Sequence, residues 1–254
     1  MRVISIIAFN TFRQTLRQRL YHNIAIFGVG MLVLSMIMGN ITFGFPDRVV
    51  RSIGLSGVSI ALDLIALLVG VGLIHEEIDK RTLFVVLSRP VGRVHYVAGR
   101  YLGLVFALTL ALIGLTGVFF LTLTAAGGSV TGPDIVAVVA ALPESMLLGG
   151  VGLVLSAFST PTLSAGIGLG IWVAAATSDD LMRLTAKAEP LLRGLTTAAY
   201  YLLPSLARLN FREAAVFGHA VRVGEVAGAL SYGVAYSVFL LALASLILAR
   251  REML

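Results

Sequence analysis

The sequence predicts an all-α polytopic membrane protein with six transmembrane helices and an N-terminal interfacial helix. Of its 254 residues, 58% are hydrophobic and only 13% are charged, which is about half the charged fraction of an ordinary soluble domain. The apolar residues form runs of about 20, the length that crosses ~30 Å of hydrocarbon. Six such runs leave no room for a separate soluble domain, so residues 1–254 are expected to form a single transmembrane domain.

The composition also excludes several kinds of chemistry. The chain has no cysteine, which rules out disulfides, thiolate metal sites and cysteine nucleophiles. Its four histidines show no metal-ligand spacing, and no phosphate-binding G-x-x-x-x-G-K-[ST] motif is present. The net charge of +6 fits orientation against an anionic inner leaflet. We therefore expect no catalytic residue, no bound metal or cofactor and no nucleic-acid partner.

Residues 2–20 show the pattern of an amphipathic helix lying in the membrane interface. Apolar residues recur at spacings of three and four, and polar residues occupy the other face. The apolar set is Phe9, Phe12, Leu16 and Leu20, and the polar set is Asn10, Arg13, Gln14 and Arg17. An ordinary basic flank before the first span is the alternative.

The six spans are expected at about 24–43, 56–74, 101–123, 135–158, 163–177 and 226–249. Pro46, Asp47, Arg48 and Arg51 are expected in a loop after the first span. The long connection of residues 178–225 is too broken by polar residues to span, so short interfacial or re-entrant helices on the outer face are expected there.

Lysine and arginine counts set the orientation. With both termini inside, eleven of the 19 basic residues face the cytoplasm and eight lie outside. Six of those eight are in the long connection, and long loops count for less. Both termini are therefore predicted to be cytoplasmic.

Residues 75–100 carry the pattern of a cytoplasmic coupling segment. Glu76 and Glu77 stand at the membrane exit, and an apolar strip that includes Leu83 and Leu87 follows at helical spacing. Pro90 then ends the helix, because proline disfavours helix in the residue before it. Such a segment can dock a partner protein; a plain solvated loop is the alternative.

Two carboxylates interrupt the spans: Asp63 in the second, and Glu144 just after Pro143 in the fourth. A carboxylate at the bilayer centre costs a few kcal/mol, so it usually faces the bundle interior or a water-filled path. Substrate contact or gating is one interpretation. A hydrogen-bonded or protonated structural group is the other.

Three motifs resemble one family. The first comprises Glu77, Thr82-Leu83, Leu87-Ser88, Pro90, Arg93, Gly99-Arg100 and Leu102-Gly103, and is similar to the loop after the second span of ABC-2 type transporter permeases. The others are Ser156-x-x-Ser159-x-Pro161 and Leu203-Pro204-Ser205-Leu206 followed by Leu209-Asn210-Phe211. The resemblance is closest to the branch with the permease of the copper-maturation system for nitrous-oxide reductase.

This resemblance implies the membrane subunit of an ATP-driven exporter in a prokaryotic cell (inner) membrane. Two separate ATPase subunits would hold ATP and Mg²⁺, and a second copy or a related permease would complete the pair. The implied ATPase-coupling residues are Glu76, Glu77, Thr82, Leu83, Leu87, Pro90 and Arg93. The implied connecting-helix residues are Phe9, Phe12, Arg13, Leu16 and Arg17. The candidates for the path or its outer gate are Asp63, Glu144 and Pro204.

Two other functions remain open from the residues themselves. A secondary transporter could use Asp63 or Glu144 as a proton carrier, although the sequence lacks the inverted repeats and broken helices typical of that class. A membrane anchor that holds a partner complex is the other alternative.

Overall fold

The computed structural model describes residues 2–42, 45–79, 93–178, 182, 197 and 203–250. The elements that it gives for these residues are all helices, which confirms the predicted all-α class. They are α1 (Arg2–Arg17), α2 (Arg19–Ile41), α3 (Pro46–Asp79), α5 (Arg93–Ala125), α6 (Gly132–Phe158), α7 (Pro161–Ala176), the 3₁₀ helix η1 (Ala207–Leu209), α10 (Arg212–Phe217) and α11 (Val223–Arg250).

Five helices of the described residues are long and apolar enough to cross a membrane, namely α2, α3, α5, α6 and α11. The predicted fifth span, residues 163–177, corresponds to α7, which is apolar but has only 16 residues. A full crossing takes about 20 residues. The described residues therefore have five full-length helices and one shorter apolar helix, which agrees with the predicted all-α polytopic membrane fold.

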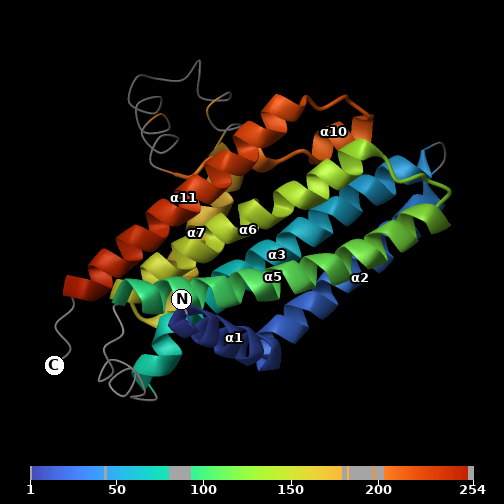
Figure 1. Cartoon of the computed structure of the whole chain (residues 1–254). Coiled ribbons are helices and arrows are strands. Elements are labelled where there is room, and N and C mark those ends of the chain that lie inside the picture. The colour runs from blue at the N-terminus through green and yellow to red at the C-terminus, as the bar shows by residue number, and fades with distance from the viewer. Residues whose placement is uncertain are drawn as a thin grey trace.

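The long helices run side by side in one bundle (Figure 1). We call one end the terminal end, because it holds α1 and the last turns of α3 and α11 (Figure 1). The opposite end, where α3 and α6 begin and α10 lies, is the distal end. The helices α3 and α6 form the centre of the bundle, since 78% and 83% of their apolar windows are buried, against 28% for α2 and α11.

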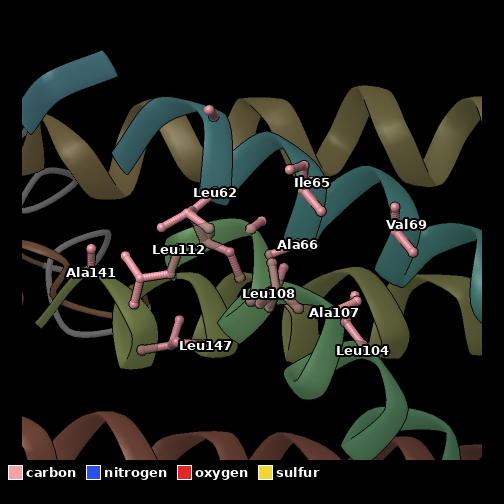
Figure 2. Close-up of a cluster of buried hydrophobic side chains, with 14 of the residues drawn as sticks. Leu62, Ile65, Ala66, Val69, Leu104, Ala107, Leu108, Leu112, Ala141 and Leu147 are labelled. Atoms are coloured by element: carbon pink, nitrogen blue, oxygen red, sulfur yellow. The ribbon is translucent and has the colours of Figure 1, made fainter. Parts of the chain in front are cut away.

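The core lies where α3, α5 and α6 meet, and Figure 2 shows its side chains interdigitating. The labelled residues of α3 are Leu62, Ile65, Ala66 and Val69, those of α5 are Leu104, Ala107, Leu108 and Leu112, and those of α6 are Ala141 and Leu147. Large apolar side chains on the outer helix faces stay exposed, including Ile26, Ile113, Leu121 and Leu246. Such faces suit contact with lipid chains.

The backbones of α3 and α6 touch at glycines. A Cβ added to Gly152 would lie 2.6 Å from the carbonyl oxygen of Leu67, and one added to Gly70 would lie 2.7 Å from that of Gly149. Ordinary contact begins at 3.4 Å. Only glycine permits this approach, which is how small residues bring membrane helices together.

Two helices begin earlier than predicted. Residues 46–51, expected in a loop, form the first turns of α3. Proline is tolerated in the first turn because no intrahelical partner for its missing N–H is lost, and Asp47 there favours the helix dipole. Similarly, α5 begins at Arg93, eight residues before the predicted Tyr101, because its first turns pack against α1.

Candidate functional site

Buried polar residues of α3 meet polar residues of neighbouring elements at three levels of the bundle. Asp63 follows Arg51 by twelve residues and precedes His75 by twelve, so each interval is about 18 Å at ~1.5 Å per residue. All three side chains are buried. Asp63 therefore lies near the middle of the membrane, and Arg51 and His75 lie near its two faces.

The middle level holds an ion pair. Arg212 of α10 donates from Nη2 to Oε1 of Glu144 over 3.1 Å, and the Glu144 side chain is 4% exposed. Asn210 positions the arginine, because its Oδ1 accepts from both the backbone N–H and the Nε of Arg212. A residue from the long connection thus reaches into the bundle to neutralise a carboxylate of α6.

Asp63 has a different environment. Its Oδ2 accepts a hydrogen bond from Nε1 of Trp172 on α7 over 3.0 Å. Its Oδ1 is buried, and no hydrogen-bond donor of the described residues reaches it. Asp63 also lies close enough to Glu144 and Arg212 to interact with their charges. The two carboxylates predicted for the path therefore lie close together. Glu144 is paired with a cation, whereas only one oxygen of Asp63 has a hydrogen-bond donor among the described residues.

The distal level is a closed network around Arg51. Its Nε donates to Oδ1 of Asp134 over 3.1 Å, its Nη1 to Asp47, and its Nη2 to the carbonyl of Ser129. The other oxygen of Asp134 accepts from the backbone and hydroxyl of Thr131. This network joins the starts of α3 and α6, and it assigns a structural role to Arg51, predicted to be a loop residue.

The terminal level is centred on His75. Its Nδ1 lies 2.9 Å from the hydroxyl of Ser156, and its Nε2 contacts the carbonyl oxygen of Ser159. Ser164 of α7 adds a bond to the carbonyl of Leu155. The Ser156-x-x-Ser159-x-Pro161 motif therefore joins the last turns of α3, where the coupling segment begins, to the turn between α6 and α7.

The N-terminal helix α1 packs on the start of α5. Arg100 is buried, and its Nη1 donates to Oε1 of Gln14 over 2.9 Å and to the Thr11 hydroxyl. An added Cβ at Gly103 would lie 2.5 Å from the carbonyl oxygen of Ala8. Gly99, Arg100 and Gly103 of the Gly99-Arg100-x-Leu102-Gly103 motif thus form the docking surface for α1, and Leu102 is exposed.

The apolar face predicted for α1 only partly coincides with the face that packs against the protein, and one of its residues, Leu20, is not in α1. Phe12 and Leu16 pack against the core, but the fully buried residues facing it are small: Ala8, Thr11 and Thr15. Phe9 is 59% exposed, because close packing on the glycines of α5 favours small side chains. Leu20 lies beyond the break at Gln18, in α2. Arg13 and Arg17 are exposed, as the amphipathic pattern predicts.

The motif from Leu203 to Phe211 packs between α6 and α11. Pro204 is buried, and the next backbone N–H, that of Ser205, donates to the Tyr232 hydroxyl over 3.0 Å. Leu209 belongs to the core. Pro204 is therefore part of a packed segment, and it does not join Asp63 and Glu144 in contacts that the structure records.

The coupling residues fall mostly outside the described part of the chain. Glu76 and Glu77 belong to the last turns of α3, and Arg93 opens α5. Thr82, Leu83, Leu87 and Pro90 lie outside the described residues. Their predicted role stays a prediction from the sequence.

A hollow lies above the middle level, at the distal end. A cavity of about 290 Å³ is bounded by α3 and α10, with Ser52, Ser56, Asn210, Arg212, Glu213, Val216 and Phe217 in its wall. A second cavity of about 180 Å³ adjoins the Arg51 network and shares Val216 and Phe217. Arg212 therefore touches both the larger cavity and the buried carboxylate of α6.

Sequence reasoning missed Arg212 and Trp172 as site residues. Arg212 counted only as one of six basic residues in the long connection, and Trp172 only as part of an apolar span. A signal was present nevertheless, because a carboxylate buried in a membrane needs a cation or a hydrogen-bond donor. The chain has a single tryptophan, which limits the indole donors to one.

The helical fold, with five described helices long and apolar enough to cross a membrane, defines a multi-pass membrane protein. The family model for ABC-2 family transporter proteins matches residues 7–252, so the chain belongs to this family. The chain is thus a multi-pass permease subunit of an ABC transporter, a class whose partner is in general an ABC ATPase. A search of curated proteins returned no match.

Proposed function

We propose that this chain is the permease of an ATP-driven exporter and that a separate ATPase docks on its terminal end through residues 75–93. One observation carries this proposal. At this end, His75 joins the last turns of α3 to the turn between α6 and α7, and Arg100 joins α5 to α1. A push on the coupling segment would therefore reach both α3 and α7.

The proposed path follows the polar interior of α3, α6 and α7. Asp63 and Glu144 lie at mid-membrane, and Arg212 holds α10 against Glu144 at the distal side. Because α10 also borders the cavity, separation of Arg212 from Glu144 would open the middle level toward the distal end. The proposed gate is thus the α10 segment, and the ion pair keeps it closed.

Family membership favours a permease over the secondary-transporter and anchor alternatives. We also propose that the direction of transport is export, that two ATPase copies bind, that the chain pairs with a second permease, and that it belongs to the copper-maturation branch. These proposals are tested by experiment on the assembled complex. The prokaryotic inner membrane and the cytoplasmic termini belong to the same proposal.

The orientation can be read by cysteine labelling, because the chain has no cysteine of its own. Val130 is 41% exposed and lies between α5 and α6 at the distal end. Val94 is 63% exposed and is the second residue of α5, at the terminal end. In spheroplasts, a membrane-impermeant maleimide is expected to label Val130→Cys and to leave Val94→Cys unlabelled.

Permeabilised spheroplasts provide the control, since both variants should then be labelled. Labelling of Val94→Cys in intact spheroplasts, with Val130→Cys protected, would show that the orientation is the opposite of the proposed one. The ATPase would then be excluded from the terminal end.

The docking site is tested by charge insertion into the coupling segment. Leu87→Asp is expected to lower the amount of ATPase that co-purifies with the chain at least about tenfold, because a buried interface anchor typically contributes 2 kcal/mol or more. Glu77→Ala should lower it as well. The measurement is quantitative pull-down from solubilised membranes.

Val223→Asp is the matched control, because Val223 is 84% exposed and starts α11 at the distal end. It should leave the ATPase yield unchanged. Equal yields from Leu87→Asp, Glu77→Ala and the parent chain would refute docking at this segment. The chain purified without its partner should hydrolyse no ATP.

A further inference from the structure

One face of α3 carries a polar stripe from the distal surface to the middle of the membrane. Its members are Ser52, Ser56, Ser59 and Asp63, and their spacings of four, three and four place them on the same helix face. Exposure falls along the stripe, because Ser52 is exposed, Ser56 is half-buried, and Ser59 and Asp63 are each 3% exposed. The stripe thus leads inward from the solvent to a buried carboxylate.

The cavity lies over the outer half of this stripe. Ser52 and Ser56 form its α3 wall, and Arg212 forms part of its α10 wall. Its volume of about 290 Å³ is far above the ~10–15 Å³ that one water needs. A small organic group therefore fits in the cavity on the distal side, with Ser56 of its wall about 10 Å along α3 from Asp63.

Among the described residues, the inner end of the stripe holds more carboxyl groups than cations. Asp63 and Glu144 supply two carboxylates within electrostatic reach of each other, and Arg212 supplies one guanidinium. Of the two carboxylates the guanidinium is bonded to Glu144, and the buried Oδ1 of Asp63 has no donor among the described residues. Glu213 adds a further carboxylate to the cavity wall. The site therefore has room for one more positive charge that carries N–H donors.

We propose that Asp63 and Glu144 bind the cationic group of the transported molecule, an organic ammonium, and that Arg212 is the internal cation that this group displaces. The inference rests on the proposed transport function and adds the class of substrate to it. An ammonium that bonds Oδ1 of Asp63 and competes for Glu144 would free Arg212, and with it α10. Binding of the substrate would thereby be linked to release of the proposed gate.

The residues present favour an organic cation over the other candidates. Among the described residues, no group of three or more His, Cys, Asp and Glu side chains could hold a metal ion. An anion would face two buried carboxylates. A neutral molecule could donate to Asp63, but it would gain nothing from the surplus negative charge.

The test compares two probes of equal shape that differ in charge, benzylammonium and benzyl alcohol. Trp172 is the only tryptophan of the chain and is bonded to Asp63, so its fluorescence reports binding at the site. With the purified full-length chain, benzylammonium is expected to bind at least about tenfold more tightly, the effect of one charge-assisted hydrogen bond.

Two variants should shift this preference in opposite directions. Asp63→Asn keeps an oxygen for Trp172 but removes the charge, so the preference should fall to about twofold or less. Arg212→Met removes the competing cation, so benzylammonium should bind about tenfold more tightly than to the parent chain. Glu225→Gln, an exposed carboxylate at the start of α11, is the matched control and should change neither affinity.

Equal binding of the two probes to the parent chain would overturn the proposal. An unchanged preference in Asp63→Asn would also overturn it, because the preference would then not depend on a negative charge at Asp63 of the parent chain. If Asp63→Asn does not fold, the probe comparison on the parent chain and the Arg212→Met measurement still decide the matter.

The proposed function and this inference can be refuted independently of each other. In inverted vesicles that contain the ATPase, selective benzylammonium binding without ATP-dependent uptake would support the site and refute the export mechanism. ATP-dependent uptake that is equal for both probes would support the transporter and refute the cationic substrate.

Discussion

Replacing Arg212 with methionine is expected to lower the free energy of unfolding of the chain by about 3 kcal/mol, because Glu144 then stays buried without its cation. The pair is closely bonded, at 3.1 Å, and the carboxylate side chain is 4% exposed. The arginine is 22% exposed, which places the effect at the lower end of the range for broken buried pairs. In thermal unfolding followed by Trp172 fluorescence, Tm should fall by about 6–12 °C.

A second substitution separates charge from packing. Adding Glu144→Gln to Arg212→Met removes the unpaired charge, so the double variant should recover most of the lost stability. Arg222→Met, at an exposed position before α11, should shift Tm by no more than about 2 °C. A double variant as unstable as Arg212→Met would show that the guanidinium acts by packing alone, and the ion pair would lose its proposed role in closing the gate.

The sequence was sufficient for the fold class because a bilayer imposes a simple rule. Every backbone polar group must be bonded within the segment, so an apolar run of about 20 residues forms a helix. The helices α2, α6 and α11 follow directly from that rule. The start of α3 did not, because Pro46 and Asp47 are common both in loops and in the first turn of a helix.

Only the two carboxylates of the site could be predicted from the sequence. Asp63 and Glu144 stand out in the sequence, since carboxylates within apolar runs are rare and costly. Their partners do not stand out, because Trp172 lies 109 positions from Asp63 and Arg212 lies 68 positions from Glu144. No period or motif relates residues so far apart, and helix packing alone brings them together.

The surface of α1 that packs on α5 could not be predicted, for a related reason. Amphipathic spacing groups Phe9, Phe12, Leu16 and Leu20 on a face for the membrane interface, and it does not identify the residues that pack against the protein. The surface of α5 that receives α1 is built of Gly99 and Gly103, which allow the backbones to approach closely. Such a surface selects Ala8 and Thr11, and leaves Phe9 for the lipid interface.

The three polar levels and the glycine contact act on the same pair of helices. Arg51 with Asp134 and His75 with Ser156 each fix the position of α3 against α6, and the two carboxylates of the middle level lie between these contacts. The glycines set the distance at which those polar groups can meet. A change in the glycine contact should therefore disturb all three levels together.

Gly152→Leu is accordingly expected to destabilise the chain by at least about 3 kcal/mol, at or beyond the upper end of the usual cost of overpacking. The first added atom would lie 2.6 Å from the Leu67 carbonyl oxygen and 3.1 Å from the Val71 nitrogen. Both are backbone atoms of α3, so no side chain can move aside. The expected result is loss of the monodisperse peak in size-exclusion chromatography, or a Tm lowered by about 6–12 °C.

Gly114→Leu is the matched control, because this glycine lies within α5 and an added Cβ there meets no atom within 4 Å. Leucine also favours helix over glycine by up to about 1 kcal/mol, so the control should keep or slightly raise the parent Tm. A Gly152→Leu chain that unfolds within about 2 °C of the parent would mean that α3 and α6 can separate at little cost. The pair could not then transmit a displacement from His75 to the carboxylates.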